Sequence, residues 1–206
     1  MQKGNMVIFD FDGVIVDSWW LAHKTSKKEY PGLTEEEHRN GFEGNIYEAD
    51  RQRAWTHKRV VIDYFGEYQK EMHLVKFFNE MDEVIRKLAR AYLLSIVSST
   101  TTPVIREYLI REGLGEHFPD VLGADVHESK QEKIHMLFET HGLTAKDCVM
   151  VTDTSGDVRE ARMAGVDSIG VSWGFHDLER LGKVETFRIV HSPKDLLKAI
   201  GDYFAR

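Results

Sequence analysis

The chain has 206 residues, 42% of them hydrophobic and 30% charged, with a formal net charge of −7. This length suffices for one well-packed domain with a small insertion, and the acidic balance argues against nucleic acid as the main partner. One cysteine excludes an intramolecular disulfide, and no apolar run approaches the ~20 residues that a membrane span needs.

Short apolar runs recur along the chain and predict the strands of a sheet. They are rich in β-branched or bulky residues and lack clean alternation, which is typical of strands buried on both faces of a parallel sheet. The runs are residues 6–9, 92–97, 148–151 and 168–171, with residues 120–124 as a weaker candidate.

Helical patterns lie between these strands. The first of them begins with Thr102 as its predicted cap and Pro103 in its first turn, and glycines follow three of the helices. Alternation of strands and helices predicts an α/β layered fold. The predicted helices are residues 103–112, 133–141, 157–164 and 193–204.

The stretch from about residue 19 to residue 83 interrupts this alternation. It is rich in charged and aromatic residues and contains no convincing strand. Two helices, at residues 34–40 and 49–68, and a loop at residues 41–45 fit its pattern. The sequence therefore predicts an all-helical insertion between the first two strands of the core.

Oxygen-bearing side chains follow three of the predicted strands. In doubly wound sheets, ligands bind beyond the carboxyl ends of the strands, so we expect these side chains to meet at one edge of the sheet. They are Asp10 and Asp12 after the first strand, Ser98 and Ser99 after the second, and Asp153 and Asp157 after the third.

Several carboxylates in one place repel one another unless a cation neutralises them. A hard divalent cation with oxygen ligands does so, and Mg²⁺ is usual where a phosphate also binds. A carboxylate can also act as a nucleophile, and phosphoryl transfer needs positive and hydrogen-bonding groups around the phosphoryl oxygens. Ser98, the start of the helix at Pro103, and Lys130, predicted in a loop, could supply these groups.

Several segments of the sequence resemble the motifs of a known family. FDFDGVIVDS, at residues 9–18, is similar to the first motif, DxDG(V/T)(L/I)xDS, of the haloacid dehalogenase-like hydrolase superfamily. VMVTDTSGDVREARMAGV, at residues 149–166, resembles its fourth motif, with Thr152 where glycine is usual. SIVSST and SKQEKI resemble the second and third motifs, and SIGVSWGF looks like a segment of the phosphoglycolate phosphatase-like branch.

The resemblance implies a fold and a division of the chain. The fold would be α/β, with a Rossmann-like three-layer parallel sheet and an inserted all-helical cap. The catalytic core would comprise residues 1–17 and 87–206, and the cap residues 18–86. The resemblance also implies a Mg²⁺-dependent phosphatase that hydrolyses a small soluble phosphomonoester, phosphoglycolate-like, through a phospho-aspartate.

The resemblance assigns roles to four acids. Asp10 would be the nucleophile and a Mg²⁺ ligand. Asp12 would be the general acid and then the base, with its backbone carbonyl on the metal. Asp153 and Asp157 would complete the metal site. A separate, structural interpretation applies to Asp17-Ser18, which we predict to cap the helix that enters the insertion.

The phosphoryl oxygens would be held by Ser98 and Lys130, with Ser99 as a second contact. Lys133 is the alternative to Lys130, because both lie near the start of the same predicted helix. The basic stretch at residues 51–59 is interpreted as a solvated helix face. Binding of a second negative group of the substrate is the alternative for that stretch.

Other functions remain open. A sugar-phosphate mutase shares both aspartates of the first motif, a haloacid dehalogenase lacks the second one, and a phosphate-binding protein without turnover would keep the site. The expected partner is a small phosphorylated metabolite, with no nucleic acid and no membrane. The residues before Met6 are too few and too polar for a signal peptide, so a cytoplasmic protein is expected, of undetermined oligomeric state.

Overall fold

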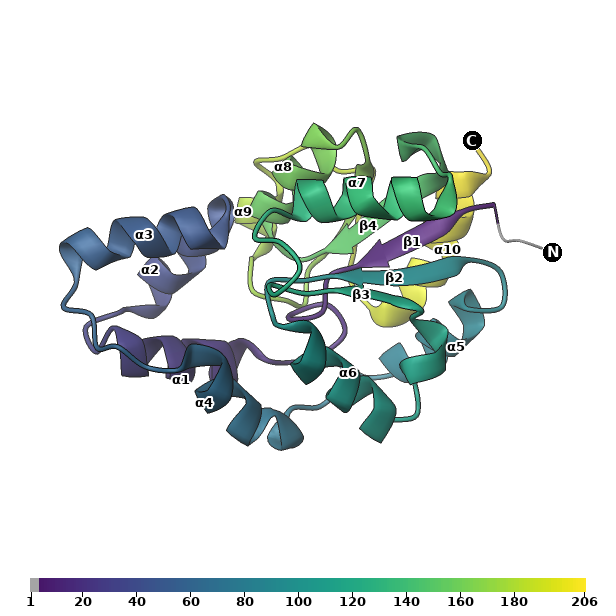
Figure 1. Cartoon of the computed structure of the whole chain (residues 1–206). Helices are drawn as coiled ribbons and strands as arrows, with labels where there is room; N and C mark the ends of the chain where they lie inside the picture. Colours follow the sequence, from purple (N-terminus) through teal and green to yellow (C-terminus); the bar gives the residue numbers. More distant parts are fainter. Residues whose placement is uncertain (1–3) are drawn as a thin grey trace.

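The computed structural model describes residues 4–206, except the side chains of residues 53–56. Residues 1–3, part of the segment interpreted as too short for a signal peptide, lie outside this description. Six parallel strands form one sheet in the order β3-β2-β1-β4-β5-β6 (Figure 1), which confirms the predicted α/β class. The strands are β1 (Met6–Phe9), β2 (Leu93–Val97), β3 (Asp120–Leu122), β4 (Cys148–Thr152), β5 (Asp167–Val171) and β6 (Arg188–Val190).

The central strand β1 explains why its sequence is apolar without alternation. Its four residues are fully buried because helices cover both faces of the sheet. Val7 and Phe9 pack on one face and Met6 and Ile8 on the other. The core is therefore two apolar layers, one on each side of the strands.

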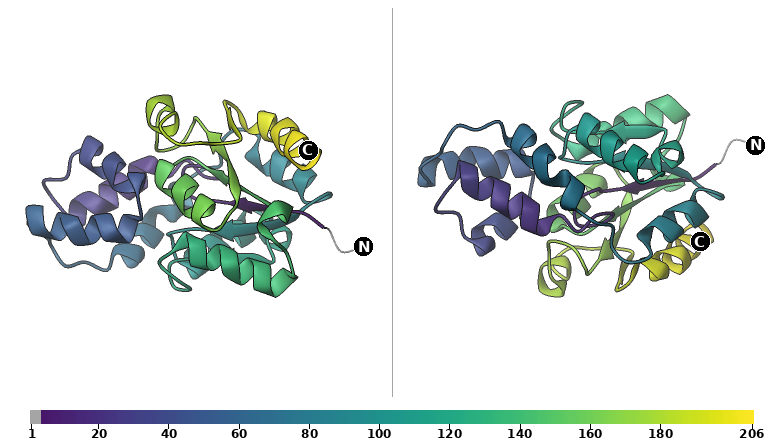
Figure 2. Two further views of the ribbon diagram at one scale, coloured as in Figure 1. Left: turned by 90° about the horizontal axis from the view of Figure 1, so that it is seen from above. Right: turned by 90° about the horizontal axis from the view of Figure 1, so that it is seen from below.

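Five helices build the outer layers (Figures 1 and 2). Those on the face of Val7 and Phe9 are α5 (Met81–Leu88), α6 (Thr102–Arg111) and α10 (Pro193–Phe204). Those on the face of Met6 and Ile8 are α7 (Lys130–His141) and α8 (Ser155–Met163). The short helices that connect these parts are α9 (Leu178–Leu181), η1 (Gly41–Glu43), η2 (Met72–Leu74), η3 (Gly115–His117) and η4 (Ala145–Asp147).

The helices between β1 and α5 lie beyond the carboxyl ends of the strands, away from both termini (Figure 1). We call helices α1 to α4 and their connections the cap. Its α1 packs against α4 and α2. The cap helices are α1 (Trp19–Glu29), α2 (Glu35–Asn40), α3 (Ile46–Thr56) and α4 (Tyr64–Glu71).

Two expectations for the cap were wrong in detail. Residues 49–68 form no single helix, because α3 ends at Thr56 and α4 begins at Tyr64, capped by the Asp63 side chain. Residues 41–45 are not wholly a loop, since η1 occupies their first part. The start of α2 is as predicted: Thr34 and Glu37 form a capping box.

Three expectations for the core also need correction. The helix predicted at residues 133–141 begins at Lys130, because Ser129 caps it, so Lys130 lies in the first turn and not in a loop. Thr101, not Thr102, occupies the cap position of α6. The short strand β6 was not predicted, since three residues at a sheet edge give too short a pattern.

The predicted division of the chain places a boundary at residue 86, which falls inside α5. That helix packs against α10 on the face of the sheet. The division at residues 18 and 86 therefore stays a prediction, and α5 is described here with the core. Among the described residues, none of the helices has the length and apolar character that crossing a membrane requires.

Candidate active site

The candidate site lies at the carboxyl edge of the sheet, where the strand order reverses between β1 and β4. Such a switch point leaves a crevice, because the connections from the two strands lead to opposite sides. Asp10 directly follows β1, and its N–H donates to Val151 O of β4 at 2.9 Å. Asp153 follows β4, so the fold brings two acids 143 positions apart to one crevice.

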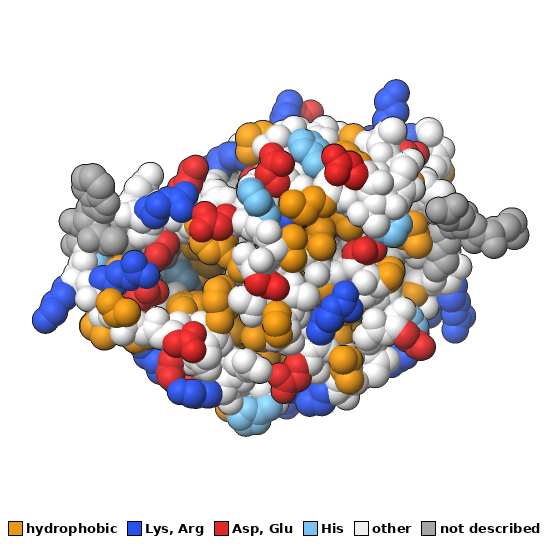
Figure 3. Space-filling view, in the orientation of Figure 1, with side chains coloured by type: hydrophobic (Ala, Val, Ile, Leu, Met, Phe, Trp, Pro, Cys, Tyr) orange, Lys and Arg blue, Asp and Glu red, His pale blue; other side chains and the backbone are white. Residues whose placement is uncertain are grey.

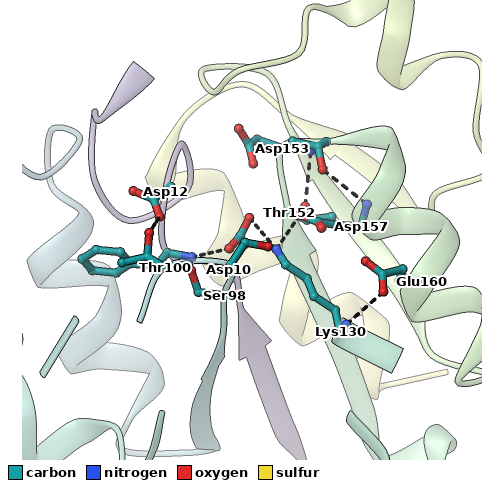
Figure 4. A network of polar contacts seen from close by, with 12 residues as sticks. Asp10, Asp12, Ser98, Thr100, Lys130, Thr152, Asp153, Asp157 and Glu160 are labelled. Carbon is teal, nitrogen blue, oxygen red and sulfur yellow. Dashed lines mark hydrogen bonds and ion pairs between the residues drawn. The ribbon is translucent and has the colours of Figure 1, made fainter. Parts of the chain in front are cut away.

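Three buried carboxylates meet there (Figure 4). Asp10, Asp153 and Asp157 each offer an oxygen, and these oxygens lie within 4.8 Å of one another. Asp153 Oδ2 accepts a hydrogen bond from Phe175 N at 2.6 Å. Asp153 Oδ1 is buried and has no hydrogen-bond partner among the described residues. A buried oxygen of this kind is unfavourable unless a ligand satisfies it.

Lys130 joins two of these acids. Its Nζ lies 2.9 Å from Asp10 Oδ2 and 2.8 Å from Asp157 Oδ2, and its side chain is 3% exposed. Burial alone would lower the pKa of Lys130, but the two carboxylates raise it above its usual value. The lysine is therefore held as a cation between Asp10 of the first motif and Asp157 of the fourth motif.

The pKa values of the three acids shift in different directions. Burial raises the pKa of Asp10 well above its usual value, against the opposing effect of Lys130. Burial also raises the pKa of Asp153, to about 7. Burial acts in the same direction on Asp157, but the charge of Lys130 and the hydrogen bonds from Asp10, Lys130 and Thr152 together lower the pKa of this carboxyl. One lysine does not balance three buried carboxylates, so the cluster favours a further cation.

Two glycines allow Asp153 its position. Gly13 has a φ of +74°, and a Cβ there would overlap the Asp153 carboxylate and lie 2.8 Å from the Phe175 ring. A Cβ at Gly174 would overlap Asp153 as well and lie 2.5 Å from Gly13 O. Glycine is therefore required at both positions by close approach.

Asp12 lies beside the acid cluster and accepts three hydroxyl hydrogen bonds (Figure 4 shows the bond from Thr100). Ser18 Oγ donates to its Oδ1 at 2.7 Å, and Thr100 Oγ1 to its Oδ2 at 2.7 Å. Tyr68 OH, from α4 of the cap, also donates to Oδ1. Ser18 occupies the cap position of α1, as predicted for Asp17-Ser18, but its side chain forms no capping hydrogen bond because its hydroxyl donates to Asp12.

The hydroxyl run after β2 borders the same crevice. Ser98 and Ser99 both line it, and Ser98 Oγ accepts from Thr100 N at 3.0 Å. Lys133, the alternative to Lys130, is fully buried and donates instead to Ser98 O at 2.6 Å. Burial and the nearby Lys130 lower the pKa of Lys133 to about 8. Of the two lysines, only Lys130 contacts the acids.

Three site residues were missed from the sequence. Thr100 is the last residue of the second motif, SIVSST, but no role was assigned to it. Tyr68 lies in a cap helix, and the sequence did not predict which face of that helix meets the core. Glu160 gave no signal beyond being a charged residue in a helix. Its Oε1 accepts from Lys130 N at 2.9 Å, Ser129 Oγ at 3.2 Å and Asn45 Nδ2 at 3.3 Å. Thr152, noted as the departure from glycine, donates to Asp157 Oδ2 at 2.8 Å.

A cavity of about 330 Å³ extends from Asp10 and Asp12 into the cap. Figure 3 shows the surface hollowed between cap and sheet, with hydrophobic side chains around the hollow. The basic stretch only partly reaches it: Arg59 lines the cavity and binds Glu29 at 2.7 Å, while Arg51 binds Glu128 at 3.1 Å. The side chains of Arg53 and Trp55, part of the same hypothesis, lie outside the described residues.

The cap is seated on the core through loop and helix-end contacts. Tyr47 OH donates to Ser99 O at 3.0 Å, and the Arg39 side chain donates to Phe175 O. The loop before α3 lies over the first turn of α8, where a Cβ on Gly156 would lie 2.6 Å from Phe42 O. The described conformation is therefore one in which the cap covers the acids.

Comparisons with known proteins identify what the chain is similar to. A sequence model of the family described as haloacid dehalogenase-like hydrolase matches residues 7–171. A phosphoglycolate phosphatase from Vibrio vulnificus (strain CMCP6) is 26% identical, with 97% of each chain covered. A 5'-nucleotidase from Pseudomonas aeruginosa is 27% identical, with 85% of this chain and 86% of the relative covered.

Solved structures give the same fold. A haloacid dehalogenase-like family hydrolase from Streptococcus pneumoniae superposes with a TM-score of 0.79 at 20% identity, covering 97% of this chain and 100% of the other. CbbY from Rhodobacter sphaeroides, solved in complex with phosphate, has a TM-score of 0.79 at 15% identity and covers 98% and 100%. At these identities the likeness establishes the architecture.

Proposed function

Because the chain belongs to the haloacid dehalogenase-like hydrolase family, we propose that it is a Mg²⁺-dependent phosphatase acting on a small phosphomonoester through an aspartyl phosphate at Asp10. The observation that carries the proposal is the cluster of Asp10, Asp153 and Asp157 with Lys130 beside Asp12. Relatives named phosphoglycolate phosphatase and 5'-nucleotidase support a phosphomonoester as substrate.

The residues present fit a divalent cation. The buried Asp153 Oδ1 lacks a partner, and the three carboxylates carry more negative charge than Lys130 balances. Asp10, Asp153 and Asp157 would hold Mg²⁺, with the backbone carbonyl of Asp12 as a further oxygen. When bound, the metal would neutralise these carboxylates and the phosphoryl oxygens.

The first half-reaction is a displacement at phosphorus. A carboxylate oxygen of Asp10 attacks, the bond between phosphorus and the ester oxygen breaks, and an acyl phosphate forms on Asp10. Asp12 gives its proton to the departing ester oxygen, which leaves as an alcohol. The second half-reaction reverses these roles: Asp12 takes a proton from water, the water oxygen attacks phosphorus, and Asp10 and inorganic phosphate are released.

Lys130 and the hydroxyl run would hold the phosphoryl group. The Lys130 ammonium already contacts the Asp10 oxygen that faces it, so it is positioned to bind phosphoryl oxygens once they lie beside that carboxylate. Ser98 and Ser99 line the same part of the cavity. Lys133 would act indirectly, by fixing the carbonyl of Ser98.

Phosphate release tests the proposal. We expect the purified protein to release inorganic phosphate from p-nitrophenyl phosphate with added Mg²⁺ and to stop when the metal is chelated. Acid-quenched protein should carry one phosphoryl group on the peptide that contains Asp10, detected by mass spectrometry. A mutase would instead isomerise a sugar phosphate without net phosphate release, and a silent phosphate-binding protein would do neither.

A further inference from the structure

The part of the cavity that would receive the leaving group is large and ringed by aromatic side chains. The cavity as a whole, including the end at Asp10 and Asp12, has a volume of about 330 Å³, near the low end of the range of pockets that hold drug-sized ligands. A phosphate with a two-carbon acid would leave much of this space to water. The cavity therefore has room for a leaving group with more atoms.

Aromatic rings from the cap form much of the wall. Four of the rings are only half-buried although they line a recess of the protein, so apolar surface remains for a ligand to cover. The half-buried rings are Phe42, Tyr47, Tyr64 and Phe65, and the buried rings of Tyr68 and Phe175 complete the wall.

The same part of the cavity offers hydrogen-bond acceptors. Glu29 and Asp50 line it, and Glu29 Oε1 holds the Arg59 guanidinium through Nε at 2.9 Å and NH2 at 2.7 Å. Asp50 lies farther from Arg59, at 3.9 Å. Carboxylates of this kind accept from the amino groups of nucleobases, and sugar hydroxyls are donors as well.

We propose that the leaving group is a nucleoside, so that the substrate is a nucleoside monophosphate. The planar base would lie among the cap rings, with its N–H donors toward Asp50 and Glu29. This inference rests on the proposed phosphatase function. It goes beyond it by naming what the cap recognises.

A matched pair of substrates tests the inference. Nucleoside 5'-monophosphates and ribose 5-phosphate present the same 5'-phosphate ester and differ mainly by the base. We expect kcat/KM to be at least about fivefold higher for the best nucleotide than for ribose 5-phosphate, since stacking of one base is worth at least about that factor. Equal or higher kcat/KM for ribose 5-phosphate would overturn the inference.

Two variants test whether a ring of the cap contacts the base. Phe65→Leu should lower kcat/KM for the nucleotide more than for ribose 5-phosphate. Phe204→Leu, which truncates a half-buried ring on α10 outside the cavity, should change neither. Equal losses for both substrates in Phe65→Leu would contradict a base-binding role. Hydrolysis of p-nitrophenyl phosphate by the wild type separates the two claims: if it occurs without any nucleotide turnover, only the substrate inference fails, and if it is absent both fail.

A second inference comes from the hydrogen bonds of Asp12. Tyr68 is 2% exposed, belongs to the cap, and donates to Asp12 Oδ1 of the core. The other two donors, Ser18 and Thr100, are not in cap helices. The orientation of the Asp12 carboxyl therefore depends in part on α4 lying against the core.

We infer that Tyr68 is a positioning residue, which orients Asp12 for proton transfer to the leaving oxygen when the cap is seated. This also rests on the proposed function. An alkyl leaving group needs that proton, whereas p-nitrophenolate leaves without it. Loss of the tyrosine hydroxyl should therefore lower kcat more for a substrate with an alkyl leaving group than for p-nitrophenyl phosphate.

Tyr68→Phe tests this role. We expect kcat to fall at least about tenfold with an alkyl phosphate such as glycerol phosphate, and by less than about threefold with p-nitrophenyl phosphate. Tyr108→Phe removes another buried tyrosine hydroxyl, which donates to Val75 O at 3.3 Å outside the site, and should affect neither substrate. Equal losses with both substrates, or no loss with glycerol phosphate, would reject the inference.

Discussion

The carboxyl edge of the sheet and the cap face one cavity, but they hold their side chains by different means. At the edge, Asp10 and Asp153 directly follow buried strands and are themselves buried. In the cap, many of the lining side chains are only half-buried, and one of them, Tyr47, contacts the core from the start of a helix. The comparison indicates that the sheet fixes the chemistry, while recognition depends on contacts that can change without disturbing the strands.

The largest effect is expected from removing the proposed nucleophile, Asp10, at the edge of the sheet. Asp10→Asn is nearly isosteric, so we expect turnover of p-nitrophenyl phosphate to fall by at least about 1,000-fold while the fold remains. Circular dichroism and thermal unfolding check the fold, and phosphate release checks turnover. Substantial remaining activity in a folded Asp10→Asn protein would show that the sheet edge does not carry the reaction as proposed.

Two lysines of α7, Lys130 and Lys133, allow a test within the core of which cation serves the reaction. Lys130→Met should lower kcat by about 100-fold, because the cation that faces the phosphoryl group is lost. Lys133→Met removes a buried ammonium of the same helix that contacts only carbonyls, and should cost less than about tenfold. Steady-state kinetics on both variants decide between them, and a larger loss in Lys133→Met would reverse the assignment.

The contact between cap and core can be loosened without touching an acid. Gly156→Ala places a methyl group against the carbonyl oxygens of Phe42 and Gly44, so the cap loop must shift. We expect kcat/KM to fall by about tenfold, as misplaced contacts far from the reacting atoms can do. The matched control is Gly201→Ala in α10, where nothing lies within 4 Å of the added Cβ. It should leave activity unchanged and raise stability by about 0.5–1 kcal/mol.

The smallest expected effect is a pH dependence set by the core alone. Burial raises the pKa of Asp153 to about 7, above the usual carboxyl value of about 4 in an unfolded chain. Between these values the folded protein binds more protons, so the stability of the metal-free protein falls as pH rises through this range. Mg²⁺ needs the carboxylate, and its stabilising effect should therefore be larger at pH 8 than at pH 6.

Thermal unfolding with and without Mg²⁺ at the two pH values measures this difference, expected to be a few degrees. Asp153→Asn should abolish most of it. The same increment of melting temperature at both pH values would mean that Asp153 does not take part in metal binding.

The acidic residues of the core site were predictable because they directly follow its strands. Asp10 and Asp153 each stand immediately after a run of buried apolar residues, and the parallel sheet brings such positions together. Lys130 was named as the site lysine although its placement in a loop was wrong. A helix start is uncertain by a few residues when the cap, here Ser129, is a weak signal.

The cap was predictable as helical but not in its contacts. Tyr68 and Glu160 reach the site through packing between segments far apart in the sequence, and periodicity does not specify which helix face meets which partner. The break between α3 and α4 was missed for a similar reason. Residues 57–63 contain no proline or glycine to mark it.

One oxygen of Glu160 accepts from three donors on two segments: the backbone of Lys130 and the hydroxyl of Ser129 at the start of α7, and the amide of Asn45 in the cap. Departure of the cap removes one of the three and leaves the start of α7 less firmly tied to α8. Lys130, beside the proposed nucleophile Asp10, is thus best anchored while the cap lies against the core. If the proposed function holds, the site would be fully assembled only around an enclosed substrate, and phosphate esters outside the cavity would meet an incomplete site.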